Sequence, residues 1–126
     1  ELVAAQLAAP RLAADPSPLE REVEALRRAT ARGDTAEQIR HSVEFHREIV
    51  RAADNSVLLH TWESLGVEVW TALSVRWLDM KLHAKAADHA QITLAFREGD
   101  PAVGRMLSDH VLNYVEAALK SHEGVG

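Results

Sequence analysis

Apolar residues recur along this chain with the three- to four-residue spacing of amphipathic α-helices. Prolines, glycines and short polar clusters interrupt the pattern, which predicts helices at about residues 1–14, 17–32, 34–54, 56–80, 82–98 and 100–121. We find no alternating strand pattern bounded by turn residues. Because short connections between long helices favour antiparallel neighbours, the sequence predicts an all-α antiparallel bundle of about six helices.

Residues with strong preferences for helix ends mark several of these boundaries. Pro10 should kink or end the first helix. Ser17 is the expected N-cap of the second helix, and Gly33 is expected to end it. Asp34 then caps the third helix. Gly66 allows a bend within the fourth helix, since an isolated glycine is tolerated there.

Composition limits the classes of function. The 126 residues fit one domain, residues 1–126. A net charge of −5 argues against a direct nucleic-acid surface, which would need clustered lysine and arginine. The absence of cysteine excludes disulfides and thiolate metal sites. No apolar run reaches the length of a membrane span, and the first residues lack the pattern of a signal peptide, so we expect no membrane partner.

Three histidines lie where a bundle helix normally carries aliphatic side chains. His46, His89 and His110 each have mainly apolar neighbours three or four residues away on both sides, so each falls on a predicted core-facing row of a different helix. His41, by contrast, shares a row with charged residues that reads as solvated surface. The remaining histidines lie on a polar row, at a helix boundary or in the C-terminal tail.

Three inward imidazoles suggest a shared purpose. Burying a polar ring without a partner costs free energy, and neutral imidazole is the commonest metal ligand in proteins. If the rings converge, three nitrogens would hold Zn²⁺ or a similar ion and leave at least one coordination position open. The alternative is three separate core histidines, each hydrogen-bonded to a backbone carbonyl or a hydroxyl. Spacing alone leaves both open, because it does not specify how the helices pack.

Two longer stretches around these histidines carry a recognisable pattern, "EFHREIVRAADNSVLLHTWESL" and "DHAQITLAFREGDPAVGRMLSDHV". The first resembles the signature FHxxIxxAxxNxxL of the FCD (FadR C-terminal) effector domain, found in FadR-subfamily GntR transcription regulators. The second is similar to that family's later signature. The resemblance covers nearly the whole chain and implies an all-α bundle with a central cavity. It also implies a divalent metal, which many members hold by one aspartate and three histidines. The positions of the three family histidines correspond to His46, His89 and His110.

The chain departs from this pattern at one position. The family's aspartate lies four residues before the first histidine, where this chain has Ser42. Ser42 and His46 still share one face of the helix, but a hydroxyl is a weak ligand without charge. We therefore expect weak or water-mediated metal contact from Ser42 and lowered metal affinity. The implied ion is Zn²⁺, with Ni²⁺ or another divalent metal as alternatives.

The resemblance implies a ligand-sensing, dimerising domain of a bacterial transcription regulator in the cytoplasm. We expect a homodimer that binds a small carboxylate effector, whose oxygen could replace the missing aspartate ligand. Arg76 and Arg47 are candidates to pair with that carboxylate, and Asn113 is a candidate hydrogen-bond donor. Operator DNA would be bound through an N-terminal winged-helix domain, which the family places upstream and which is absent from this chain.

Two alternatives from other classes remain open. A metal-dependent enzyme with a three-histidine site would need a general base near the ion, and none is marked on an inner row. A purely structural dimerisation bundle would bind neither metal nor ligand. We expect the sensor and no catalysis.

Overall fold

The computed structural model describes residues 2–67, 69, 71 and 82–110, and every regular element in this part of the chain is a helix. The labelled helices are α1 (Leu2–Ala14), α2 (Ser17–Arg32), α3 (Thr35–Ala52), α4 (Ser56–Ser64) and α6 (Leu82–Glu98). Residues 103–110 form a further helical segment. The described residues contain no strand, which confirms the all-α prediction. No helix among them is long and apolar enough to cross a membrane.

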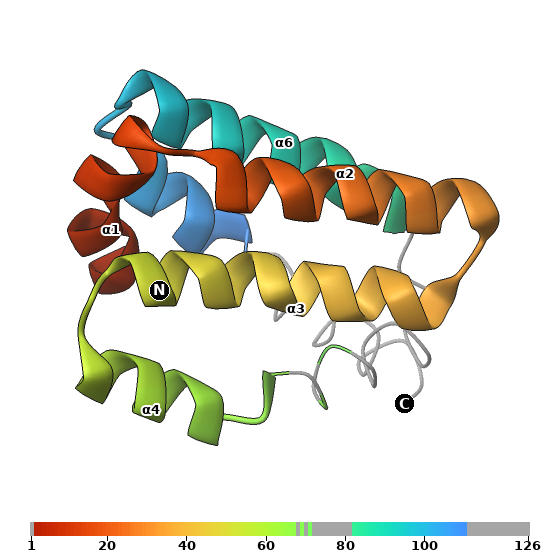
Figure 1. Cartoon of the computed structure of the whole chain (residues 1–126), viewed down its shortest axis with the longest axis horizontal. Helices are drawn as coiled ribbons and strands as arrows, with labels where there is room; N and C mark the ends of the chain where they lie inside the picture. Colours follow the sequence, from red (N-terminus) through yellow and green to blue (C-terminus); the bar gives the residue numbers. More distant parts are fainter. Residues whose placement is uncertain (1, 68, 70, 72–81, 111–126) are drawn as a thin grey trace, which may run out of the picture.

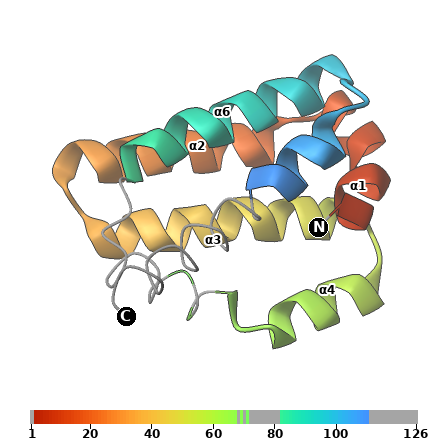
Figure 2. The same ribbon diagram turned by 180° about the vertical axis from the view of Figure 1, so that it is seen from behind.

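The helices form a bundle with α3 at its centre. Helices α2, α3 and α6 lie lengthwise beside one another, and α1 crosses one end of the group (Figure 1). Helix α3 packs against α1, α2 and α4, while α6 packs against α1 and α2. Seen from behind, the segment 103–110 lies between α6 and α3 (Figure 2). Sequence-distant segments therefore meet along one face of α3.

The core forms where the apolar rows of these helices meet. Phe45 and Ile49 of α3 and Phe96 of α6 are almost wholly buried. Burial of side chains of this size stabilises the fold by about 1.5–3 kcal/mol each. Helix α1 contributes mainly the small residues Ala4, Ala5 and Ala8 to the core. The buried face of α3 also includes polar residues, and these belong to the site described below.

The connection between α2 and α3 is as the sequence predicts. Gly33 ends α2 in the left-handed conformation, with φ of 66°, and its N–H donates to the carbonyl of Thr30. Asp34 caps α3, and its carboxylate accepts from the N–H of Glu37 at 3.2 Å. The predicted bounds of the 82–98 helix also agree with α6, which ends just before Gly99. These signals act within four residues of one another, so they can be read locally.

The start of α2 corrects one prediction. Ser17 is the first residue of the helix and not its N-cap, a position that Pro16 occupies without a side-chain hydrogen bond. Asp15 provides the side-chain acceptor instead, receiving the Ser17 hydroxyl at 2.6 Å and the Ser17 N–H at 3.1 Å. These two bonds, the hydroxyl first, hold the pKa of Asp15 below its ordinary value. An aspartate side chain readily accepts from the N–H two residues later and so forms a turn. This turn precedes α2 in place of the expected serine cap.

One helix end agrees with expectation and one differs from it. Helix α1 runs to Ala14, the predicted bound, with Pro10 inside it. Helix α4 ends at Ser64, where a continuous helix to residue 80 with a bend was expected. The reason is that Gly66 adopts φ of 65°, and a left-handed residue cannot continue a right-handed helix. Residues 67, 69 and 71 of the expected helix are helical, and residues 68, 70 and 72–80 lie outside the described residues.

Candidate metal centre

Three buried histidines meet in the interior of the bundle. His46 comes from α3, His89 from α6 and His110 from the segment 103–110, and their exposed fractions are 8%, 0% and 6%. One ring nitrogen from each lies within 4.8 Å of the others. The helical register predicted this inward placement, and the packing of α3, α6 and segment 103–110 brings the rings together. Their role as metal ligands stays a prediction.

The three rings are arranged at angles to one another. His46 and His110 stack at 19° with centroids 5.5 Å apart. His89 stands edge-on to both, at 77° to His46 and 81° to His110. Phe45 packs edge-on against His89, with centroids 4.6 Å apart, and so closes one side of the cluster with an apolar ring. A set of non-parallel rings can direct lone pairs toward one point, which a stack of three parallel rings cannot.

The donor set fits a divalent ion. Nitrogens bound to a tetrahedral Zn²⁺ at its usual bond length lie about 3.4 Å apart. The nitrogens here lie within 4.8 Å, so a small inward movement of the rings would bring them to that separation. Neutral imidazole suits Zn²⁺ and Ni²⁺. The chemistry of the residues present therefore agrees with the implied metal.

Ser42 faces this cluster from α3, one turn before His46. Its side chain is buried, and its Oγ lies 3.5 Å from Nε2 of His89. The position that carries an aspartate in the family pattern is therefore next to the three rings in this chain. Because Ser42 is neutral, it adds an oxygen but no negative charge.

A carboxylate also approaches the cluster from α6. Asp88 directly precedes His89 and projects away from the inner row of α6, yet its Oδ2 lies 3.8 Å from Nδ1 of His110. The side chain of Asp88 is 56% exposed. No local signal indicates this contact, because Asp88 meets a histidine from another segment.

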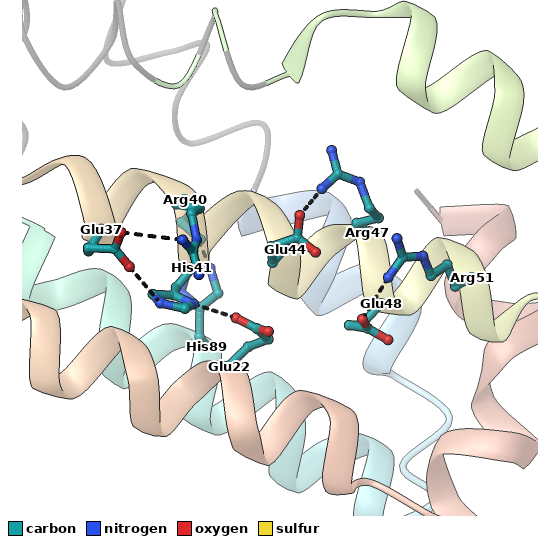
Figure 3. Close-up of polar contacts among 10 residues, drawn as sticks. Glu22, Glu37, Arg40, His41, Glu44, Arg47, Glu48, Arg51 and His89 are labelled. Atoms are coloured by element: carbon teal, nitrogen blue, oxygen red, sulfur yellow. Dashed lines mark hydrogen bonds and ion pairs between the residues drawn. The ribbon is translucent and has the colours of Figure 1, made fainter.

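The row of charged residues around His41 predicted a solvated face, and the structure shows that this prediction is wrong. Its side chain is only 15% exposed and lies between α3 and α2. Nδ1 contacts a carboxylate oxygen of Glu22 at 2.7 Å, and Nε2 contacts Glu37 at 3.1 Å (Figure 3). The charged row was correctly identified, but α2 packs along this side of α3 and covers part of it. His41 thus links the two helices outside the three-histidine cluster.

Of the three residues predicted to contact an effector, the structure describes only Arg47. Arg47 contacts the carboxylate of Glu44 within α3 and lies 3.7 Å from Glu63 of α4 (Figure 3 shows the first contact). Its guanidinium also lies 5.5 Å from the centre of the Trp62 ring. Arg47 therefore joins α3 to α4, and a role in effector binding stays a prediction. Arg76 and Asn113 lie outside the described residues.

Fold and site together define a class of protein: an all-α domain whose interior carries a cluster of histidines. The chain matches the FCD domain family over residues 1–113 and belongs to that family. It is also similar to a probable D-xylose utilization operon transcriptional repressor of Paenarthrobacter nicotinovorans, with 38% identity over 103 residues. That match covers 81% of this chain but 46% of the relative, so the chain spans about half the relative's length. No solved structure gives a significant match.

Proposed function

We propose that this chain is the ligand-sensing and dimerisation domain of a bacterial GntR-family transcription regulator. In this proposal a divalent metal, Zn²⁺ first and Ni²⁺ or another ion as alternatives, is held by His46, His89 and His110. The observation that carries the proposal is the burial of three converging imidazoles inside an FCD domain. The name of the relative, a probable transcriptional repressor, supports the regulatory class.

The metal explains why the bundle places these side chains inside. Three buried imidazoles without an ion occupy core positions that aliphatic residues would fill at lower cost. Coordination by three nitrogens offsets that cost and couples metal binding to the packing of α3, α6 and segment 103–110. When bound, the ion supplies a concentrated positive charge and an open coordination position. His46, His89 and His110 would hold it, and Phe45 would keep water from one side.

The proposed effector is a small carboxylate. A donor set of neutral imidazoles and the Ser42 hydroxyl leaves the charge of a divalent ion uncompensated within that set. An anionic oxygen from the effector would supply the charge that an aspartate provides in the family pattern. Arg76, Asn113 and Arg47 are further proposed contacts, and Arg47 would have to exchange one of its present carboxylate partners.

Sensing requires that the effector bind two arrangements of the protein unequally. We propose that the domain pairs as a homodimer in the cytoplasm and that the effector favours one arrangement of the pair. A winged-helix domain N-terminal to this chain would then gain or lose affinity for operator DNA. The chain itself would contact no DNA and catalyse no reaction.

Metal binding by the purified chain tests this proposal. We expect chelator-stripped protein to take up one equivalent of Zn²⁺ or Ni²⁺ per chain, measured by elemental analysis and competition with a chromophoric chelator. Replacing His110 by glutamine should weaken the affinity by more than about tenfold. His60→Gln is the matched control, because His60 is exposed on α4 and outside the cluster.

Three results would contradict the proposal. Equal metal affinities of the His110→Gln and His60→Gln variants would contradict the assignment of His110 as a metal ligand. Turnover of a candidate effector by metal-loaded protein would establish the three-histidine enzyme instead. Absence of metal uptake, together with unchanged thermal stability in the presence of carboxylates, would leave a purely structural dimerisation bundle.

A further inference from the structure

We propose that Asp88 is a positioning residue that orients His110 at the three-histidine centre. This inference rests on the proposed metal site and assigns a role to a residue outside its set of ligands. It starts from one contact between two segments: Oδ2 of Asp88, on α6, lies 3.8 Å from Nδ1 of His110, on the segment 103–110.

The geometry of the imidazole ring gives this contact a consequence. Nδ1 and Nε2 lie on different edges of the ring, so a ring that presents Nδ1 to Asp88 presents Nε2 elsewhere. Nε2 of His110 is buried, and the ring lies between 4.9 and 5.5 Å from those of His89 and His46. Asp88 therefore marks the outward edge of His110, and Nε2 is the nitrogen assigned to the ion.

A carboxylate at the outward nitrogen also sets the tautomer. A neutral imidazole carries one N–H, and an acceptor beside Nδ1 favours the form with the proton there. The lone pair is then on Nε2, where a metal needs it. Histidines that bind metals usually donate their other N–H to a carboxylate or carbonyl in this way. The present separation of 3.8 Å is longer than a hydrogen bond, so the proposed role requires the half-exposed Asp88 side chain to move closer to Nδ1.

The negative charge of Asp88 lies near a site that lacks the family aspartate, because this chain has Ser42 at that position. Ser42 leaves the buried ligand set without negative charge, while Asp88 places a carboxylate behind one of its histidines. Asp88 is half exposed, so this carboxylate also stays in contact with water. A carboxylate in this position is a usual partner of a metal-binding imidazole and fixes the orientation of its ring. A merely structural pairing of α6 with segment 103–110 would affect stability but not the tautomer of His110.

The test compares Asp88→Asn with Asp109→Asn in the full chain. Asp109 directly precedes His110, is exposed and loses the same charge, so it is the matched control. The Zn²⁺ affinity is measured by chelator competition, and the tautomer of His110 by nitrogen-15 NMR of the metal-free protein. We expect wild-type His110 to carry its proton on Nδ1 and Asp88→Asn to reduce that population. Zn²⁺ affinity should fall by about 10- to 100-fold in Asp88→Asn.

Asp109→Asn should leave tautomer and affinity at their wild-type values, and Asp88→Glu should recover part of the affinity because it keeps the carboxylate. A wild-type His110 protonated on Nε2, or equal losses in Asp88→Asn and Asp109→Asn, would overturn the role of Asp88. Zn²⁺ uptake with equal affinities in wild type and Asp88→Asn would overturn this inference alone. A wild-type chain that takes up no Zn²⁺ would overturn the proposed metal function as well.

Discussion

A histidine on the apolar row of a helix needs a physical reason, because its ring nitrogens lose their hydrogen bonds to water on burial. His46 illustrates this: it occupies a core position of α3 and is 8% exposed. The structure surrounds it with two other imidazoles. If the proposed ion binds, its coordination would offset the cost of burying all three rings.

We expect Ser42 to limit the metal affinity of the proposed centre, because a hydroxyl carries no charge. Replacing Ser42 by aspartate adds a charged oxygen ligand beside His89, whose Nε2 lies 3.5 Å from the serine Oγ. We expect Zn²⁺ affinity to rise by at least about tenfold. Without metal the same substitution buries a carboxylate in the core, so the Tm of the stripped protein should fall. The two effects have opposite signs, and thermal melts with and without Zn²⁺ measure both.

A matched control for this substitution is Ser64→Asp, at an exposed position of α4. It should change neither the metal affinity nor the difference in Tm between loaded and stripped protein. Unchanged affinity in Ser42→Asp would show that Ser42 does not reach the ion.

At the scale of elements, short-range signals determine where most of the helices begin and end. Gly33 adopts φ of 66° at the end of α2, and an added Cβ there would meet no atom within 4 Å. Any cost of a side chain at this position is therefore backbone strain and not steric overlap. The Asp34 cap follows directly, so the turn and the start of α3 form one unit.

Replacing Gly33 by alanine should lower the free energy of unfolding by about 1–2 kcal/mol, the cost of the left-handed conformation for a residue with a Cβ. Denaturant unfolding of metal-free protein measures the change. Gly33→Asn is the comparison, because asparagine tolerates this conformation better, and it should lose less. Equal losses in the two variants would argue against backbone strain as the cause.

At the scale of the whole molecule, α3 connects the candidate centre to the rest of the bundle. It carries Ser42 and His46 and packs against α1, α2 and α4. His41 adds a polar link to Glu22 of α2, and Arg47 adds one to Glu63 of α4. A shift of α3 on binding would therefore reach three neighbouring helices, which is the arrangement that a sensor needs.

Effector binding should depend on the metal. We expect a carboxylate from a small panel to raise the Tm of Zn²⁺-loaded protein and to leave stripped protein unchanged. A ligand at 100 times its dissociation constant stabilises the folded state by about 2.7 kcal/mol. The panel includes a sugar acid and its uncharged parent sugar. These two compounds separate the need for a carboxylate from recognition of sugar hydroxyls.

The control is His46→Gln loaded under the same conditions, which should show no ligand-dependent rise in Tm. An equal rise in loaded and stripped wild-type protein would separate the effector site from the metal. Size measurement of the loaded protein with and without ligand would report a change in the paired state.

The amino-acid sequence alone determined the helical class, the turn at Gly33 and Asp34, the bounds of α6 and the inward register of the three histidines. Each depends on residues within about four positions, because a helix and its caps are built from local hydrogen bonds. Its misreading at Ser17 was also local, since Asp15 accepts both the hydroxyl and the N–H of Ser17, and the serine hydroxyl therefore donates to Asp15 and does not cap the helix.

Only the tertiary structure decided which inner faces meet. It brought His110 beside both His89 and Asp88, and it covered His41 with α2. These contacts join residues from different helices, and their pairing follows from the packing of all the helices together. Helix register is a property of one segment, whereas a site built from three segments exists only once the bundle has formed.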